Sequence, residues 1–402
     1  MFNTSLSGYQ EILTDPSYKG QFVVFTYPHI GNVGINLDDM ESGQCHLGGV
    51  IIRDLSLKVS NYRSAMTLDA YLKEQGVLGI ANVDTRAITR RLRVTGCLNG
   101  VISTDAARSD AELVEATRAW TIVGKDLIKE VTCAEPYEWR DATEDEWEFA
   151  AAAKARGGEE PYFVVAYDFG IKHNILRRLA SFGCRITVVP ADFPAEKVLA
   201  MNPDGVFFSN GPVSAAAPRG GVVGGGGGRA GGWCAVGVLE RPARVPAWSA
   251  AQCSDRGRGP GKRGEQGADS PARTAAPRPQ GDPSAVPYAV ENAKKVLGKK
   301  PVFGICMGHQ VLGQAFGAST FKLKFGHHGG NHPIRYNLDG RIEISAQNHN
   351  FAVDPATLPP GVEVSHINLN DGTCAGMVYP SMKAMTIQVR EGTPGVERSA
   401  ML

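Results

Sequence analysis

From Tyr162 onward, continuous apolar runs alternate with stretches that have a helical pattern. The apolar runs are YFVVAYDFG, CRITVVP, DGVFFSN and PVFGIC, and the stretches between or after them are IKHNILRRLASFG, AEKVLAMN, SAVPYAVENAKKVLGK and MGHQVLGQAFG. Apolar strands that alternate with helices are buried on both faces of a parallel sheet with crossover helices. The sequence therefore predicts an α/β domain over residues 162–402, with its active site at the carboxyl ends of the strands.

The first 138 residues have a different pattern and predict a smaller, mixed β/α domain. Short β-branched runs indicate strands at QFVVFTYP, GGVIIRD, GVLGIANV and GCLNGVIST, and helices are expected near Thr67–Glu74 and Thr85–Arg93. The polar, largely acidic residues 139–161 predict a linker. The chain begins abruptly in sequence typical of a folded domain, without a signal or transit pattern, so we expect a missing upstream segment.

Composition excludes several classes of function. The net charge of +1 over 402 residues gives no indication of a nucleic-acid partner, and no apolar run is long enough to cross a membrane. The eight cysteines are scattered without a CxxC pair, which is typical of a reducing compartment. GHHGGNHP lacks the spacing that completes a zinc site, and GRGPGKRG fails the phosphate-loop pattern. No metal is therefore expected in this chain.

The segment GICMGHQ places Cys306 at the turn between an apolar run and a helix. Gly304 and Gly308 give room for the sharp strand–nucleophile–helix turn. At a helix N-terminus, free N–H groups and the helix dipole favour thiolate over thiol. The N–H of Met307 is placed to donate to an oxyanion beside the sulfur. The pattern predicts a nucleophilic cysteine, and a buried cysteine that merely ends a strand is the competing interpretation.

PVFGICMGHQ resembles the nucleophile motif of the triad glutamine amidotransferases, which hydrolyse glutamine and deliver ammonia. Further segments narrow the resemblance to the small, glutamine-hydrolysing subunit of carbamoyl-phosphate synthase: FNTSLSGYQEILTDPSY, TYPHIGNVGIN, VDTRAITRRLR, VVAYDFGIKHNILR, FKLKFGHHGGNHP and AQNHNFAVD. The similarity covers roughly residues 2–212 and 281–388. It implies an α/β fold in which a flavodoxin-like amidotransferase domain with a mostly parallel sheet follows the smaller N-terminal domain.

The resemblance also implies roles for particular residues. Cys306 would be the nucleophile that forms a glutamyl thioester. Asn350 stands where some relatives have glycine, and Gly211 and Gly281 are the two halves of a family loop with the sequence SNGPGDP. The implied substrate-binding residues are Ser17, Gly211, Gly281, Met307, Gln310, Asn348, Asn350 and Phe351.

The resemblance further implies a large, ATP-using partner subunit that receives the ammonia for arginine and pyrimidine synthesis. ATP and its metal are expected on that partner, so no cofactor is expected in this chain. A separate small subunit in a eukaryote suggests the plastid stroma, with the cytoplasm as the alternative. An amidotransferase subunit of a different synthase is disfavoured by the N-terminal motifs, which the broader superfamily lacks.

Residues 213–280 interrupt the SNGPGDP motif between Pro212 and Gly281. The segment holds 15 Gly, 13 Ala, 9 Arg and 7 Pro among 68 residues and no Ile, Phe, Tyr or Met, a composition that cannot bury enough apolar surface to fold. It begins with Val, whose codons start GT, and ends with Gln, of which one codon is CAG. We hypothesise a retained intron in a GC-rich eukaryotic gene, with a natural disordered loop as the alternative; transcripts across the Pro212–Val213 join would distinguish them.

The C-terminal residues 389–402 also depart from the family. The family's last strand ends in HPE, whose His is the general base for the cysteine and whose Glu orients it. Here Arg390 occupies the His position, Glu391 is one residue out of register, and the last histidine is His366. We therefore expect impaired glutaminase activity in this chain. The alternative is a catalytically inactive pseudo-subunit that only binds the large subunit.

Overall fold

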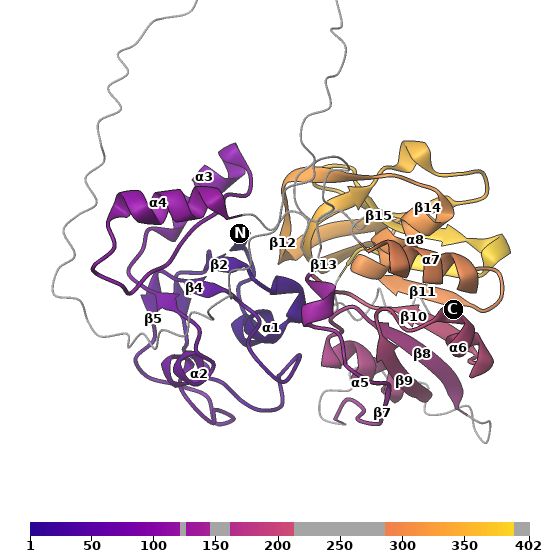
Figure 1. Cartoon of the computed structure of the whole chain (residues 1–402), viewed down its shortest axis with the longest axis horizontal. Helices are drawn as coiled ribbons and strands as arrows, with labels where there is room; N and C mark the ends of the chain where they lie inside the picture. Colours follow the sequence, from indigo (N-terminus) through magenta and orange to yellow (C-terminus); the bar gives the residue numbers. More distant parts are fainter. Residues whose placement is uncertain (121–125, 145–160, 213–285, 390–402) are drawn as a thin grey trace, which may run out of the picture.

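The computed structural model describes residues 1–120, 126–144, 161–212 and 286–389. It has two lobes that lie side by side (Figure 1). The indigo and purple lobe holds β1 to β6 and α1 to α4, and the magenta to yellow lobe holds β7 to β16 and α5 to α8. The two lobes correspond to the smaller N-terminal domain and the α/β domain that the sequence predicts.

The N-terminal domain is built on a small parallel sheet of order β1-β2-β4-β6, beside a two-stranded pair of β3 and β5. Thr67 and Asp84 cap the two predicted helices, which begin one residue later. The run GCLNGVIST forms no strand, so that prediction is wrong. The bounds are β1 Phe2–Asn3, α1 Tyr9–Thr14, η1 Pro16–Tyr18, β2 Phe22–Phe25, β3 His29–Ile30, β4 Gly49–Ile51, β5 Asp54–Leu55, α2 Leu68–Glu74, β6 Gly79–Ile80, α3 Thr85–Thr95 and α4 Asp110–Ala119.

The second domain contains a ten-stranded sheet of order β13-β12-β14-β15-β16-β11-β10-β8-β9-β7 in the described part of the chain. Its centre, from β16 to β9, is parallel, and the apolar runs found in the sequence form it. The bounds are η2 Ile128–Glu130, β7 Tyr137–Trp139, β8 Tyr162–Asp168, β9 Cys184–Pro190, β10 Gly205–Phe208, β11 Val302–Ile305, β12 Thr320–Tyr336, β13 Ile342–Val353, β14 Glu363–Asn368, β15 Cys374–Tyr379 and β16 Ala384–Ile387. This centre confirms the predicted α/β class with a parallel sheet.

Helices cover both faces of the parallel centre, as expected for a doubly wound sheet. The apolar side chains of α6, α7 and α8 pack in one core cluster, whereas those of α5 pack in a second cluster on the other side. The bounds are α5 His173–Ser181, α6 Ala195–Ala200, α7 Pro287–Val296 and α8 Met307–Phe316. The carboxyl ends of β10 and β11 therefore meet at one edge of this layer, where the candidate site lies.

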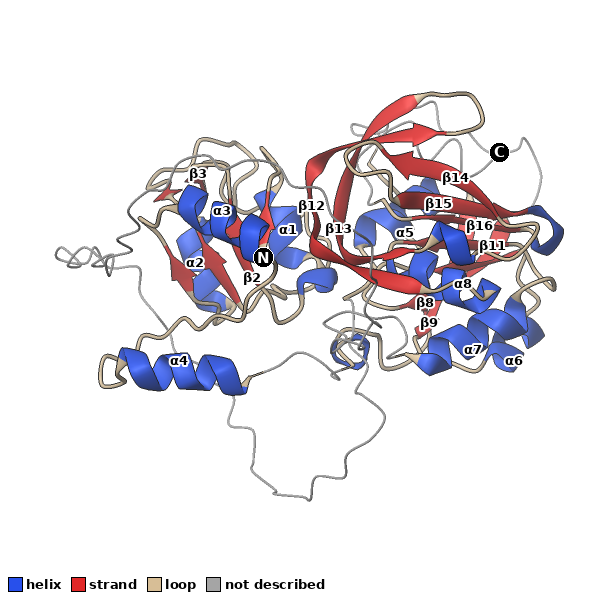
Figure 2. Ribbon diagram, turned by 90° about the horizontal axis from the view of Figure 1, so that it is seen from above, coloured by secondary structure: helices blue, strands red, loops and turns tan. Residues whose placement is uncertain are grey.

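An antiparallel extension of the sheet, from β15 to β13, is the part that the sequence pattern does not predict. The strands β12 and β13 form a long hairpin that reaches the N-terminal domain (Figure 2), where β12 contacts β1 and α3. On another part of the domain junction, Lys172 Nζ and Glu41 Oε1 form a buried ion pair of 2.7 Å. The strand β7, at the expected domain boundary, pairs with β9 of the large sheet.

Candidate active site

Cys306 lies at the predicted turn between β11 and α8. Its backbone has φ 54° and ψ −100°, a positive-φ conformation that costs a non-glycine residue of order 1–3 kcal/mol. The neighbouring glycines leave no room for side chains. A Cβ on Gly308 would lie 2.1 Å from the carbonyl oxygen of Phe208, and one on Gly304 would lie 2.5 Å from Leu312 Cδ1. Close packing of α8 against the sheet thus maintains the strained turn at Cys306.

The Cys306 thiol is completely buried, and burial raises its pKa to about 12. The Met307 N–H and the Gln388 side chain lower this pKa by smaller amounts. The sulfur lies 3.8 Å from the carbonyl oxygen of Asn348, to which only a protonated thiol can donate. The Met307 N–H thus favours the thiolate, as expected at a helix N-terminus, but the cost of desolvating the charge exceeds this stabilisation and the thiol is the favoured form.

The loop that follows β10 packs directly against the start of α8. The Gly308 N–H donates to the carbonyl oxygen of Ser209 at 3.0 Å, and the Phe169 N–H donates to Ser209 Oγ at 2.9 Å. A Cβ on Gly211 would lie 2.0 Å from the carbonyl oxygen of Phe169, so only glycine fits there. The first half of the loop is thus held close to the nucleophile. Its second half, with Gly281, lies outside the described residues.

Asn210 joins this loop to the N-terminal domain. Its Nδ2 donates to Ser17 Oγ at 3.1 Å and to the carbonyl oxygen of Gly170 at 3.0 Å. Its Oδ1 accepts from the backbone N–H of Lys172 at 3.2 Å. Asp15 Oδ1 accepts from the Ser17 N–H at 2.9 Å and so orients the short η1 turn. Ser17, although it belongs to the N-terminal domain, therefore reaches the carboxyl end of β10.

Met307 and Gln310 face the interior from α8, where both are completely buried. Gln310 Nε2 donates to the carbonyl oxygen of Phe351 at 2.9 Å and to Gln388 Oε1 at 3.1 Å. Gln310 Oε1 is buried and has no hydrogen-bond partner among the described residues. The structure thus brings Gln310 and Phe351 together and leaves one buried acceptor available to a polar ligand.

Asn348 and Asn350 lie on β13 and contact the same histidine. His328 Nδ1 is 2.7 Å from Asn348 Oδ1, and His328 Nε2 is 3.3 Å from Asn350 Oδ1. Burial lowers the pKa of His328 to about 3, so its ring is neutral at physiological pH. The Cys97 thiol also donates to Asn350 Oδ1 at 3.5 Å. The side chain of Asn350 is therefore engaged at the domain junction.

No histidine hydrogen-bonds to Cys306 in the part of the chain that the structure describes, which includes all nine histidines. His309, three residues after Cys306, instead places Nδ1 2.8 Å from Thr386 Oγ1. Burial lowers the pKa of His309 to about 3 and that of His349 well below its usual value. Arg390, at the position of the expected base, lies outside the described residues. The described site thus holds the candidate nucleophile Cys306 without a histidine hydrogen-bonded to it.

Three contacts of this site were missed by the sequence reasoning. Asn210 lies in the first half of SNGPGDP and His328 in GHHGGNHP, whereas Gln388 lies just before the departing C-terminal residues 389–402. Their importance comes from partners far away in the chain; Asn210 and Ser17 are 193 residues apart. The only available signal was the presence of uncharged polar residues at the ends of apolar runs, which does not identify the partner.

In the ranges that the structure describes, no three His, Cys, Asp or Glu side chains are grouped so that they could hold a metal ion. GHHGGNHP instead forms part of β12, where His327 Nε2 is 2.8 Å from Asp371 Oδ2. No helix among the described residues is both long and apolar enough to cross a membrane. GRGPGKRG lies outside the described residues.

A strand–cysteine–helix turn at the carboxyl edge of a doubly wound sheet is the arrangement of a glutamine amidotransferase of class I, and the model of that class matches residues 165–224 and 279–389. A second family model, described as the carbamoyl-phosphate synthase small chain, CPSase domain, matches residues 1–102. The chain belongs to the family of carbamoyl-phosphate synthase small chains, the glutamine-hydrolysing enzyme subunits of that name.

Relatives in plants and bacteria support this membership over nearly the whole chain. The chloroplastic carbamoyl phosphate synthase small chain of Arabidopsis thaliana is 52% identical over 396 residues, which cover 98% of this chain and 76% of that protein. The small chain of Escherichia coli is 42% identical over 407 residues, covering 100% of this chain and 88% of that protein. A glutamine amidotransferase structure from Thermotoga maritima matches with a TM-score of 0.32 and 15% identity, over 58% of this chain and 76% of that one.

Proposed function

We propose that this chain binds L-glutamine and has the site that hydrolyses it, with Cys306 as the nucleophile, as the amidotransferase subunit of a carbamoyl-phosphate synthase. The strained turn that presents the Cys306 sulfur is the observation that carries the proposal. The sulfur attacks the amide carbon of glutamine, and the Met307 N–H with the backbone at Gly211 and Gly281 stabilises the resulting oxyanion. Collapse releases ammonia and leaves a glutamyl thioester, which water hydrolyses to glutamate.

The remaining site residues would bind and orient the substrate. The unpartnered Gln310 Oε1 can accept from the α-ammonium group of glutamine, and Ser17 Oγ can contact its polar end from the N-terminal domain. Asn348, with the backbone at Asn350 and Phe351, would complete the other side of the pocket. Support for this comes from the contact of the Cys306 sulfur with the Asn348 carbonyl oxygen, and from the hydrogen bond that Gln310 Nε2 donates to the carbonyl oxygen of Phe351 on the same strand.

We also propose that turnover by this chain is severely impaired. With a thiol pKa of about 12, only about one sulfur in 10⁵ is a thiolate at pH 7. General-base catalysis contributes typically about 10²–10⁴-fold, and the amine leaving group also needs a proton that an arginine cannot shuttle. The alternative is a pseudo-subunit that binds its partner without hydrolysing glutamine, and it has the same structural support.

The expected partner is the large subunit of carbamoyl-phosphate synthase, which would receive the ammonia and carry ATP and its metal. Supplying carbamoyl phosphate would serve arginine and pyrimidine synthesis. Two of the relatives are chloroplastic proteins, from Arabidopsis thaliana and Oryza sativa, which supports a plastid stroma location over the cytoplasm. No nucleic-acid or membrane partner is proposed.

The test is glutamate release by the full chain in complex with its large subunit. We expect turnover reduced by about 10² or more relative to a family member that has the His–Glu pair. The double variant Arg390→His with Gly392→Glu restores the spacing of HPE and should raise glutamate release, whereas Arg398→His in the same tail should not. Trapping labelled glutamine as a thioester separates binding from chemistry, with Cys306→Ser as the blank.

Each outcome decides between the two functions. Near-normal glutamate release by the unaltered chain would show that the missing base does not matter and would refute the impairment. Complex formation with neither thioester nor rescue by the double variant would favour the pseudo-subunit. Slow release that disappears in Cys306→Ser and rises in the double variant supports an impaired amidotransferase.

A further inference from the structure

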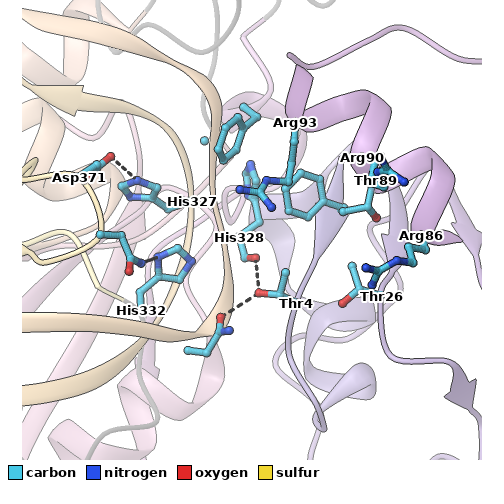
Figure 3. A pocket seen from close by; sticks show the side chains of 15 residues that line it. Thr4, Thr26, Arg86, Thr89, Arg90, Arg93, His327, His328, His332 and Asp371 are labelled. Carbon is cyan, nitrogen blue, oxygen red and sulfur yellow. Dashed lines mark hydrogen bonds and ion pairs between the residues drawn. The ribbon is translucent and has the colours of Figure 1, made fainter. Parts of the chain in front are cut away.

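We propose that the cleft between α3 and β12 binds a small phosphate-bearing anion. The cleft has a volume of about 660 Å³ and lies where the N-terminal domain meets the long β12–β13 hairpin (Figure 3). Volumes of about 300–1,000 Å³ and positions at domain junctions are typical of small-molecule sites. Cys306, Ser17 and Gln310 are not among the residues that line it, whereas His328, which contacts Asn348 of the candidate active site, is. The cleft thus adjoins the candidate active site at His328 but is formed mainly by other residues, and this proposal goes beyond glutamine hydrolysis.

One wall of the cleft carries three arginines of α3. Arg86, Arg90 and Arg93 are four and three residues apart, which places them on one side of the helix, and they approach the cleft from that side in Figure 3. All three side chains are exposed, and within the described residues none of them has a hydrogen bond or an ion pair. Like charges so close together repel each other, and an anion between them would relieve this repulsion.

The opposite wall supplies polar groups with little charge. His327 Nε2 is 2.8 Å from Asp371 Oδ2, and Asn370 Nδ2 donates to His332 Nδ1 at 3.2 Å. Burial lowers the pKa of His332 to about 4, so its ring is neutral and its Nε2–H remains a donor. Apart from its histidines, the lining has three arginines and one carboxylate, which give a net charge of +2.

A phosphate monoester fits this lining in charge and in shape. Its second pKa is about 6, so at neutral pH it is mostly a dianion that balances a charge of +2. Guanidinium groups bind phosphate oxygens through paired, charge-assisted hydrogen bonds. Phe2 and Phe325, whose ring centroids are 6.1 Å apart, also line the cleft and offer apolar surface to the organic part of the ligand. A singly charged carboxylate would leave half of the positive charge unbalanced.

The two walls are already held together without a ligand. The Thr4 N–H donates to the carbonyl oxygen of His328 at 3.3 Å, and Thr4 Oγ1 donates to Asn331 Oδ1 at 2.9 Å. Thr4 belongs to the N-terminal domain, whereas His328 and Asn331 belong to β12. A ligand would therefore enter a preformed cleft and would not have to order its walls first, which lowers the free-energy cost of binding.

Isothermal titration of the full chain tests the proposal with inorganic phosphate and phenyl phosphate, against sodium chloride at equal ionic strength. We expect saturable 1:1 binding of both probes, with phenyl phosphate the tighter. Arg90→Gln should weaken binding about tenfold or more, because it removes a charge-assisted contact. Arg91→Gln is the matched control: Arg91 is exposed on the same helix and does not line the cleft. It should change the affinity by less than about twofold, because charges exposed to solvent are screened.

Three outcomes would overturn the proposal. One is the absence of saturable binding of either probe, and another is equal weakening by Arg90→Gln and Arg91→Gln, which would indicate nonspecific surface charge. The third is that Arg90→Gln impairs association with the large subunit while the unaltered chain binds neither probe; the cleft would then dock an acidic protein segment. Because binding is measured directly, a failure of glutamine hydrolysis does not affect the result.

Discussion

Alkylation of Cys306 by iodoacetamide is expected to accelerate about tenfold for each pH unit between pH 7 and pH 10, without reaching a plateau. The reagent reacts with the thiolate, and burial raises the pKa of this thiol to about 12. At pH 8 the thiolate fraction is then about 10⁻⁴, whereas a thiol of ordinary pKa is about one quarter ionised. Ionisation alone should make Cys306 roughly 10³-fold slower than an ordinary cysteine.

The assay follows the peptide that carries Cys306 by mass spectrometry, since seven other cysteines are present in the chain. The same peptide from the chain unfolded in urea is the control. There the rate should level off above about pH 9, because the thiol regains its ordinary pKa. Limited access of the reagent to a buried sulfur lowers the alkylation rate of the folded chain by the same factor at every pH. The comparison therefore uses the dependence of the rate on pH, which access does not change.

A plateau of the folded profile at or below pH 8 would refute this reasoning. It would mean that a positive charge near the sulfur offsets the cost of burial, and Arg390 is the residue whose position in the sequence allows this. The variant Arg390→Gln would then shift the plateau to higher pH. If the plateau stayed where it was, the helix N-terminus alone would be sufficient to hold the thiolate.

Gly308→Ala should destabilise the fold by about 1–3 kcal/mol in urea unfolding, because its Cβ would lie 2.1 Å from a backbone oxygen. Gly43→Ala is the control: a Cβ there meets nothing within 4 Å, so the stability should change little. Burial lowers the pKa of His309 to about 3, so the folded protein loses about 2 kcal/mol of stability between pH 6.5 and pH 5, where the unfolded chain takes up a proton and the folded chain does not. His309→Gln should therefore flatten the pH dependence of the free energy of unfolding between pH 6.5 and pH 5. An unchanged slope would contradict this. Lys172→Met should lower the free energy of unfolding by about 3–5 kcal/mol, because it leaves the Glu41 carboxylate buried without its cation. Adding Glu41→Gln should recover part of that loss. A double variant less stable than Lys172→Met would contradict a stabilising ion pair.

The parallel centre of the large sheet could be predicted from the sequence because it depends on local patterns. Apolar runs of about strand length and helical periodicity are properties of neighbouring residues. The turn at Cys306 was predictable for the same reason: Gly304 and Gly308 are needed within four residues of each other, where the chain turns sharply. Local patterns also located the two N-terminal helices near Thr67–Glu74 and Thr85–Arg93, which the structure places at Leu68–Glu74 and Thr85–Thr95.

The antiparallel extension and the domain junction could not be predicted in this way. The hairpin of β12 and β13 has two register shifts, which depend on its contacts with the rest of the fold. Thr4 and Asn331 meet across 327 residues, and the cleft between α3 and β12 exists only because of such contacts. The arginines of α3 can be seen in VDTRAITRRLR, but the sequence does not show that Arg86, Arg90 and Arg93 line one cleft opposite β12.

The protonation state of Cys306 shows a second limit of sequence reasoning. The position at a helix N-terminus can be read from GICMGHQ, and it favours a thiolate. The degree of burial cannot be read from the same residues, because it depends on residues elsewhere in the chain, such as Asn348 on β13, whose carbonyl oxygen is 3.8 Å from the sulfur, and Phe207 and Val389 in the same core cluster. Desolvation is the larger effect here, so the thiol is the favoured form even though the position of the cysteine favours a thiolate.

The insertion and the loss of the general base that we propose would have different consequences for this chain. On one side of the insertion, Ser209 and Asn210 are bonded to α8 and to Ser17, and on the other side α7 packs in the core of the sheet. Both flanks are therefore anchored by contacts of their own, and lengthening the connection from about 5 to about 70 residues costs only about 2–3 kcal/mol of closure entropy. A domain can tolerate that cost. No packing contact can replace a proton acceptor beside a thiol whose pKa is about 12. We therefore expect these departures from the family to reduce glutamine hydrolysis more than they reduce the stability of the fold.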